Sequence, residues 1–186
     1  MAVKVTINTI NIDKLKMLDE DVLRKSILLP LLAHIEVQNI IDIHGSSEKG
    51  IYIYFETCDA FGHRRRFGVQ IKNKDIVCTS QPNKVSIITI INQIKMTFSR
   101  RIKFGTSDKG NDGVHIDGFY VITSGKVSKE AADWIFENRN TYSYIQIVDG
   151  GELMEIIKNK DELKRRNSSG FIFSTIKSQT GVNKNE

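Results

Sequence analysis

The stretch GIYIYFETCDAFGHRRRFGVQIK, residues 50–72, predicts two β-strands joined by a tight turn. Residues 51–57 and 65–72 are rich in β-branched and aromatic side chains, which favour strands. Residues 58–63 between them include an aspartate and a glycine, which are residue types that turns prefer. The sequence therefore predicts an antiparallel β-hairpin at this place.

The register of the hairpin decides which side chains meet. A turn centred on Phe61 places Tyr52 directly opposite Gln70 on the neighbouring strand. Side chains alternate between the two faces of a sheet, so Lys72 is expected on the same face as Gln70 and Tyr52. The hairpin is thus predicted to gather a tyrosine, a glutamine and a lysine on one face.

Hydrophobic periodicity predicts the elements around the hairpin. Asp19 and Ser128 are suitable helix caps, and Pro30 predicts a kink in the first helix. Short apolar strands alternate with helices in the second half, which indicates parallel pairing. We therefore expect an α/β fold with a mixed central sheet flanked by helices on both faces. The expected helices are 20–35, 84–101, 128–138 and one after Asp149, and the further strands are 37–43, 119–122 and 145–148.

The length of 186 residues suits one domain with a full core. We predict an N-terminal extension over residues 1–18, a folded domain over 19–160 and a basic, polar C-terminal extension over 161–186. The last segment has no clear period, so no helix and a mobile tail are expected there, with residues 171–176 as the candidate for one further strand.

The composition excludes several classes of protein. Hydrophobic residues make up 40% and charged residues 26%, as in globular domains, and no apolar run is long enough to span a membrane. Cys58 and Cys78 are too few for a disulfide framework or a zinc site, and the N-terminus has no apolar signal-peptide core. We therefore expect a cytoplasmic protein with no membrane span.

The net charge of +5 favours a polyanionic partner. The positions of the Lys and Arg residues are more informative than the net charge, because several of them are adjacent in the sequence. They equally suit solvated faces and helix C-termini, where cations complement the helix dipole. The DNA-binding candidates are Arg64, Arg65, Arg66, Arg100, Arg101 and Lys103.

Three segments together resemble a known family. They are HGSSEKGIYIYFETCDAFGHRRRFGVQIK (44–72), GFYVITSGKVSKEAADWIFENRN (118–140) and YIQIVDGGELMEII (144–157). An apolar strand into Thr-Ser-Gly, a helix beginning Ser-Lys-Glu-Ala and an apolar strand into Asp-Gly form a specific combination. The chain resembles the Mrr-like restriction endonucleases of the PD-(D/E)XK nuclease superfamily over most of its length.

The resemblance implies a site for Mg²⁺ on the hairpin. In that family the first strand carries Gly-Ile-Asp, whose aspartate binds the metal, and the second carries Glu or Gln followed by Lys. Gly50, Ile51, Gln70 and Lys72 match, but Tyr52 takes the place of the aspartate. A neutral phenol is a poor ligand for Mg²⁺, so this departure affects the chemistry itself. The lysine would stabilise the attacking hydroxide and the phosphate, or else is an exposed strand residue.

Two other carboxylates are candidates to replace the missing aspartate as a metal ligand. Asp59 lies at the turn, roughly 20–25 Å from Gln70 along the strands, which is too far for a shared metal. Glu48 precedes the strand, and the alternation of side chains puts it on the same face as Gln70 and Lys72. Gln70 and Glu48 are therefore the candidate metal ligands. Glu48 is alternatively a surface partner of Lys49 or Lys74.

The resemblance leaves three functions open. The first is a Mg²⁺-dependent DNA endonuclease of restriction or anti-phage defence, with Gln70, Lys72 and Glu48 as catalytic residues and activity weakened by Tyr52. The second is a catalytically dead pseudonuclease that binds DNA. The third is a protein-interaction module that reuses the fold. Because the chain is short, we expect a separate sensor or motor protein to supply target recognition. The sequence leaves open whether the chain forms a homo-oligomer.

Overall fold

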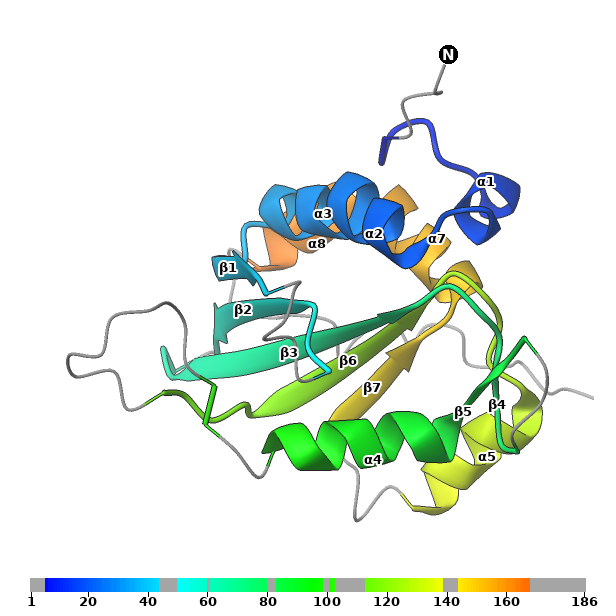
Figure 1. Ribbon diagram of the computed structural model, residues 1–186. Helices are drawn as coiled ribbons and strands as arrows, with labels where there is room; N and C mark the ends of the chain where they lie inside the picture. The colour runs from blue at the N-terminus through cyan, green and yellow to red at the C-terminus, as the bar shows by residue number, and fades with distance from the viewer. Residues whose placement is uncertain are drawn as a thin grey trace, which may run out of the picture.

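A computed structural model describes residues 6–43, 50–59, 61–79, 83–98, 101–102, 113–138 and 144–167. Its centre is a five-stranded sheet with the strand order β1-β2-β3-β6-β7 (Figure 1). The first three strands are antiparallel neighbours, whereas β6 runs parallel to β3 and β7 parallel to β6. The strands are β1 (Gln38–Asp42), β2 (Ile53–Cys58), β3 (Arg64–Lys72), β6 (Gly118–Thr123) and β7 (Ile145–Val148).

Helices cover both faces of this sheet. Figure 1 shows α2, α3, α7 and α8 on one side and α4 and α5 on the other, which confirms the expected α/β class. Among the described residues, no helix has the length and apolar character needed to cross a membrane. The helices are α1 (Ile12–Lys16), α2 (Glu20–Val22), η1 (Leu23–Leu28), α3 (Leu29–His34), α4 (Ile87–Phe98), α5 (Lys129–Glu137), α7 (Gly150–Lys158) and α8 (Lys160–Asn167).

The predicted first helix is present but is not uniform. Its middle, η1, is a π-helix, and Pro30 lies near the start of α3. Proline has no N–H to donate and its ring collides with the carbonyl four residues earlier. The wider π-helical turns just before Pro30 take the place of the predicted kink.

Two apolar cores lie on the two faces of the sheet. Phe55 and Val69 pack under α2, α3 and α7, whereas Tyr54, Phe119 and Val121 pack against α4 and α5. The strands are therefore apolar on both faces, which explains their nearly continuous hydrophobic sequences.

Glycine and phenylalanine alternate where β3 meets β6. Phe67 is paired with Gly118 and Gly68 with Phe119. A Cβ atom at Gly68 would lie 2.8 Å from Cε2 of Phe119, and one at Gly118 would lie 2.7 Å from Cε1 of Phe67. Each ring thus lies over the glycine of the other strand, and these two parallel strands approach without room for a further side chain.

Both predicted extensions contain residues that contact the domain. Leu15 of α1 is fully buried in the same core as Phe55. The C-terminal segment begins with α8, although no helix was expected in it. Leu163 of that helix is buried, and the Lys164 Nζ atom lies 2.7 Å from Oε1 of Glu36. A small parallel sheet of β4 (Ile76–Val77) and β5 (Val85–Ser86) was also not predicted.

Candidate functional site

The β2–β3 hairpin has the predicted register. Ile53 is paired with Val69, and the Tyr52 backbone N–H donates a hydrogen bond to the Val69 carbonyl at 2.8 Å. The register centred on Phe61 is therefore confirmed from Ile53 to Cys58. It slips by one residue at Tyr52, whose N–H bonds to Val69, the partner of Ile53, and not to Gln70.

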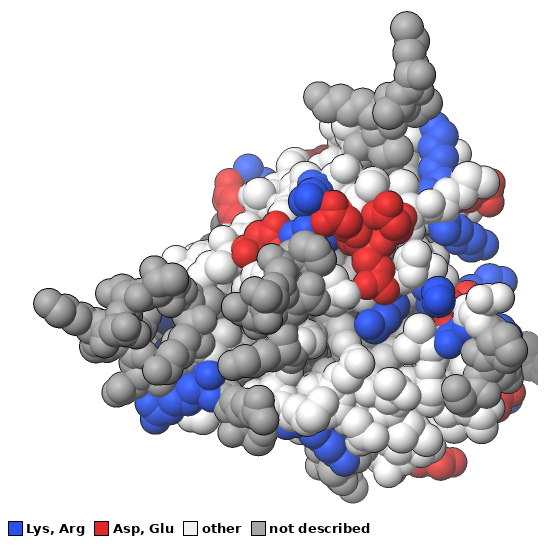
Figure 2. Space-filling view, viewed as in Figure 1, with Lys and Arg blue, Asp and Glu red and all other residues white. Residues whose placement is uncertain are grey.

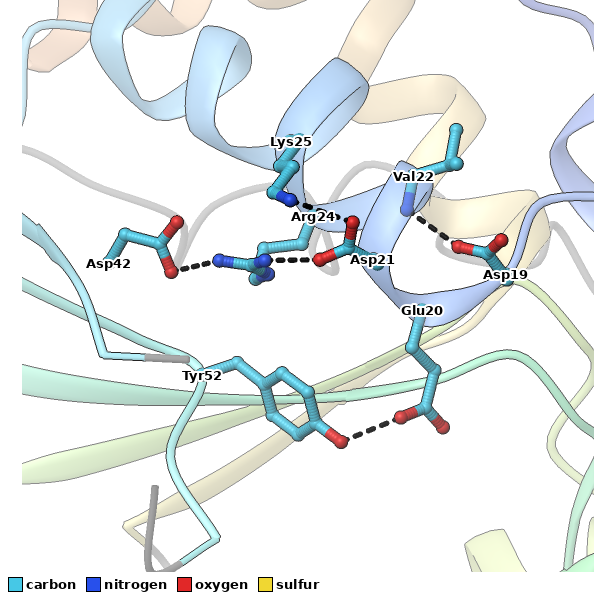
Figure 3. Close-up of polar contacts among 8 residues, drawn as sticks. All are labelled: Asp19, Glu20, Asp21, Val22, Arg24, Lys25, Asp42 and Tyr52. Atoms are coloured by element: carbon cyan, nitrogen blue, oxygen red, sulfur yellow. Dashed lines mark hydrogen bonds and ion pairs between the residues drawn. The ribbon is translucent and has the colours of Figure 1, made fainter. Parts of the chain in front are cut away.

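Tyr52 and Gln70 nevertheless project to opposite faces of the sheet. Tyr52 packs against the core under α2 and α3, and its hydroxyl donates to Oε2 of Glu20 at 2.7 Å (Figure 3). Gln70 lies on the other face, where its Nε2 donates to Oε1 of Gln93 in α4 at 2.5 Å. Ile51 is likewise buried in the core on the α4 side. The expectation that Tyr52 and Gln70 share one face is wrong.

The reason for this reversal lies in the backbone before β2. Gly50 has a φ of +86°, and a Cβ atom on it would lie 3.6 Å from Oγ1 of Thr97 in α4. The chain passes close to α4, bends at Tyr52 and enters the strand only at Ile53. Side chains alternate between faces only within a strand, so the alternation does not extend back to Tyr52.

Acidic side chains cluster beside Tyr52. Figure 2 shows them gathered over the N-terminal end of the helix that begins with α2. Arg24 is only 1% exposed and donates hydrogen bonds to both Asp21 and Asp42 (Figure 3). Glu20 and these two aspartates carry three negative charges against the two cations Arg24 and Lys25, so the cluster has a net negative charge.

Neighbouring cations keep this cluster charged. Hydrogen bonds from Lys25 and Arg24 lower the pKa of the Asp21 carboxyl to about 2. The Lys25 Nζ atom donates to Oδ2 of Asp21 at 2.8 Å. Sequence analysis missed Glu20 as a partner of Tyr52. Its place in the first turn of a capped helix gave no sign of it, because 32 residues separate the two side chains.

The side chains at the predicted metal site do not fit Mg²⁺. Gln70 is buried and its Oε1 accepts no hydrogen bond from a described residue, so it offers one neutral oxygen. Mg²⁺ is normally bound through one or two carboxylates together with water. Within the described part of the chain, no three His, Cys, Asp or Glu side chains are grouped so that they could hold a metal ion. Glu48 lies outside the described residues.

Lys72 ends β3 and is half-buried. It is paired with Thr123 of β6, and its carbonyl accepts the N–H of Ser124 at 3.1 Å. One residue separates it from Gln70 on the same strand, so the Gln-x-Lys pair does share a face. The pair is present on one face, and Glu48, the carboxylate expected to complete the metal site, is not among the described residues.

The Thr-Ser-Gly and Asp-Gly segments that carry the family resemblance are packing elements. A Cβ atom at Gly125 would lie 2.6 Å from the backbone N of Asp75, and one at Gly150 would lie 2.4 Å from the carbonyl O of Ser124. The Gly150 N–H donates to the Gly125 carbonyl at 2.8 Å. Asp149 caps α7. Glycine is therefore required at position 125 by the close backbone of residues 74–75 after β3, and at position 150 by the end of β6.

The opposite end of the hairpin is cationic. Arg64 and Arg65 are 64% and 56% exposed. The nearest carboxylates are Glu56, 3.7 Å from Arg64 and 3.9 Å from Arg66, and Asp59, 3.8 Å from Arg65. All three distances are long for an ion pair, and the exposed guanidinium groups of Arg64 and Arg65 are held weakly, although Glu56 itself is buried.

Glu56 is held mainly by other partners. Its carboxylate accepts hydrogen bonds from the Tyr54 hydroxyl and from Nδ2 of Asn39. Burial raises the pKa of the Glu56 carboxyl, but these two hydrogen bonds, with the charges of Arg64 and Arg66, outweigh burial and leave the pKa below its usual value. Glu56 is thus an ionised, buried acceptor whose hydrogen bonds do not depend on the arginines.

The second predicted basic cluster is described only in part. Arg101 is exposed, and its Nε lies 3.3 Å from Nε2 of His115. Arg100 and Lys103 lie outside the described residues. The structure therefore locates three of the four described candidate arginines together, at the turn of the hairpin.

No protein-family model, no curated protein and no solved structure matches this chain. The function is therefore inferred from the geometry of the hairpin and from the resemblance of its sequence to the Mrr-like endonucleases.

Proposed function

We propose that this chain is an Mrr-like nuclease-fold domain that binds DNA and does not cleave it. The observation that carries the proposal is the separation of Tyr52 from Gln70. One side chain is hydrogen-bonded to Glu20 on the α2 side, and the other to Gln93 on the α4 side. A metal ion cannot be shared by two side chains on opposite faces of a sheet.

The charges near Tyr52 support the loss of cleavage. Hydrolysis of a phosphodiester with Mg²⁺ requires carboxylates that hold the ion, so that it can activate water and neutralise the phosphate. Here Glu20 accepts the tyrosine hydroxyl, and Asp21 and Asp42 accept from Arg24. These acids are engaged in structural contacts on the α2 side, whereas Gln70 and Lys72 face α4, so none of the three acids joins the Gln-x-Lys pair.

The charges at the other end of the hairpin support DNA binding. Arg64 and Arg65 are exposed and weakly paired, and Arg66 follows them in sequence. Cations that neutralise phosphates release counterions from DNA, so binding of this kind weakens steeply as salt increases.

The test is a fluorescence anisotropy titration of labelled duplex DNA at 50 and 200 mM salt, together with a plasmid nicking assay in Mg²⁺. We expect binding that weakens steeply with salt, and no nicking. Changing Arg64, Arg65 and Arg66 together to Gln should lower the slope of log affinity against log salt by up to about 3, at about 0.9 for each phosphate contact.

A matched control removes the same charge elsewhere. Lys14, Lys16 and Lys129 are exposed lysines of α1 and α5, and their combined change to Gln should leave most of the slope in place. Absence of binding at 50 mM salt would refute DNA binding. Nicking that requires Mg²⁺ and disappears in Lys72→Ala would show instead that the chain is an active endonuclease.

A further inference from the structure

The turn of the β2–β3 hairpin projects beyond both neighbouring strands. In the described residues, pairing of β2 with β1 reaches Glu56, and pairing of β3 with β6 begins at Phe67. Arg66 also exchanges hydrogen bonds with Asp117, and the Thr57–Arg65 and Cys58–Arg64 pairs beyond it have no further strand beside them among the described residues. The end of the hairpin is therefore a short two-stranded ribbon at the edge of the sheet.

The turn is held in one conformation by Asp59. Its Oδ1 accepts the backbone N–H of Phe61 at 3.0 Å and that of His63 at 2.9 Å. Its own N–H donates to the His63 carbonyl, and its carbonyl accepts from Gly62, both at 2.9 Å. A side chain presented on this turn is pre-organised, so little conformational entropy is lost when it binds.

Phe61 is presented at the end of this turn. It is 86% exposed, and its ring centroid lies 6.3 Å from that of His63. An exposed aromatic ring on a fixed turn buries almost no surface within the fold. It therefore fits a role in contact with a partner rather than in stability.

The arginines lie on both faces of the ribbon. Arg66 is opposite Glu56 and shares a face with Arg64, whereas Arg65 is opposite Thr57 and projects to the other face. Duplex DNA presents a phosphate strand on each wall of a groove, and a two-stranded ribbon is narrow enough to enter one. Cations on both faces match the two walls.

We propose that this ribbon enters a groove of duplex DNA, places Arg64 and Arg65 against the phosphates of opposite walls and inserts the Phe61 ring against a base step. The inference rests on the proposed DNA binding and names the element that carries it. Apolar side chains inserted between base pairs partly unstack them and kink the duplex. The arginines behind the ring would hold the two strands while it does so.

The experiment measures unstacking directly, with the full chain and a duplex that contains 2-aminopurine. We expect the unmodified chain to increase 2-aminopurine fluorescence. Phe61→Ala should lose this increase and weaken binding roughly tenfold, the order expected for one base–aromatic stack. Phe61→Trp should retain both. Phe136 of α5 is also exposed, at 65%, so Phe136→Ala is the control and should behave as the unmodified chain.

Arg64→Gln and Arg65→Gln test the placement between two walls. Each should lower the salt slope by about 0.9. A change in only one of the two variants would refute contact with both walls. Full binding and full fluorescence in Phe61→Ala would refute insertion while leaving DNA binding intact, whereas no binding by the unmodified chain would refute the proposed function itself. A loss in Phe61→Ala confined to single-stranded DNA would refute entry into a duplex groove.

Discussion

The two ends of the β2–β3 hairpin differ in charge, in exposure and in how their side chains are held. At the open end, Tyr52 and Gln70 are hydrogen-bonded to helices on opposite faces, and acidic residues surround the tyrosine. At the closed end, Phe61 and the arginines are exposed, with weak ion pairs. Nine residues separate Tyr52 from Phe61, about 30 Å of extended strand. Under the proposed function, the closed end is the surface for nucleic acid, and the open end lacks the arrangement needed for cleavage.

The largest effect is expected when an arginine is changed to alanine at each end of the hairpin in turn. Arg24→Ala should lower the free energy of unfolding by about 3 kcal/mol, because it removes a buried cation between two carboxylates. Arg65→Ala should change it by less than about 0.5 kcal/mol, since this side chain is exposed. Urea denaturation measures the free energy of unfolding of both variants, and a DNA titration measures their affinity for DNA.

In the DNA titration the order should reverse. Arg65→Ala should weaken binding and Arg24→Ala should not, at temperatures where both are folded. Similar effects of both variants on both measurements would show that the two ends are one functional unit.

Tyr52→Asp should destabilise the fold without restoring cleavage. The change removes an aromatic ring packed on the core and places a carboxylate next to Glu20, so a loss of about 2–3 kcal/mol is expected. Because position 52 faces α2, the new carboxylate is on the wrong side of the sheet for Gln70. Plasmid nicking in Mg²⁺ is the measurement, and Tyr52→Phe is the control that removes only the hydroxyl. Nicking by Tyr52→Asp would mean that the segment before β2 can reverse its face.

Asp59→Ala should loosen the hairpin turn while the rest of the sheet is unchanged. The carboxylate accepts the N–H groups of Phe61 and His63, so hydrogen exchange at these two amides should accelerate. Affinity for DNA should fall as well, because the turn is no longer pre-organised. The amide of Ile53 serves as the internal control. Unchanged exchange at residues 61 and 63 would show that the turn does not depend on this side chain.

The smallest expected effect is a loss of stability in acid from the open end. Hydrogen bonds from Lys25 and Arg24 lower the pKa of Asp21 to about 2, well below the ordinary value for an aspartate. A carboxyl with a lowered pKa in the folded state contributes stability above its unfolded pKa, and the contribution is lost as the pH falls through the folded pKa. Stability should therefore decrease between about pH 4 and pH 2, and Asp21→Asn should show less of this decrease in thermal unfolding. An identical pH profile would exclude this ion pair as its source.

Much of the fold could be predicted from the sequence because local chemistry decides it. The turn residues between two β-rich segments fixed the hairpin register, and Ser128 and Asp149 marked the starts of α5 and α7. The helix α8 was missed because KDELKRRN contains one apolar residue, Leu163. Helical periodicity cannot be recognised from a single apolar position.

The candidate site was predicted less well than the fold. Gln70 and Lys72 lie on the expected strand and share a face, but Tyr52 does not lie with them. The alternation rule was applied to Tyr52, which precedes the strand, where Gly50 brings the chain close to α4. The partner Glu20 is distant in sequence, and no local pattern predicts such a contact.

The close contacts at the two glycines after β6 and β7 limit what the Thr-Ser-Gly and Asp-Gly segments can report. Any side chain at Gly125 or Gly150 would collide with backbone atoms, so packing alone is enough to require glycine at both positions. These two glycines therefore carry information about the fold and none about chemistry, whereas the face to which position 52 projects decides whether its side chain can meet Gln70.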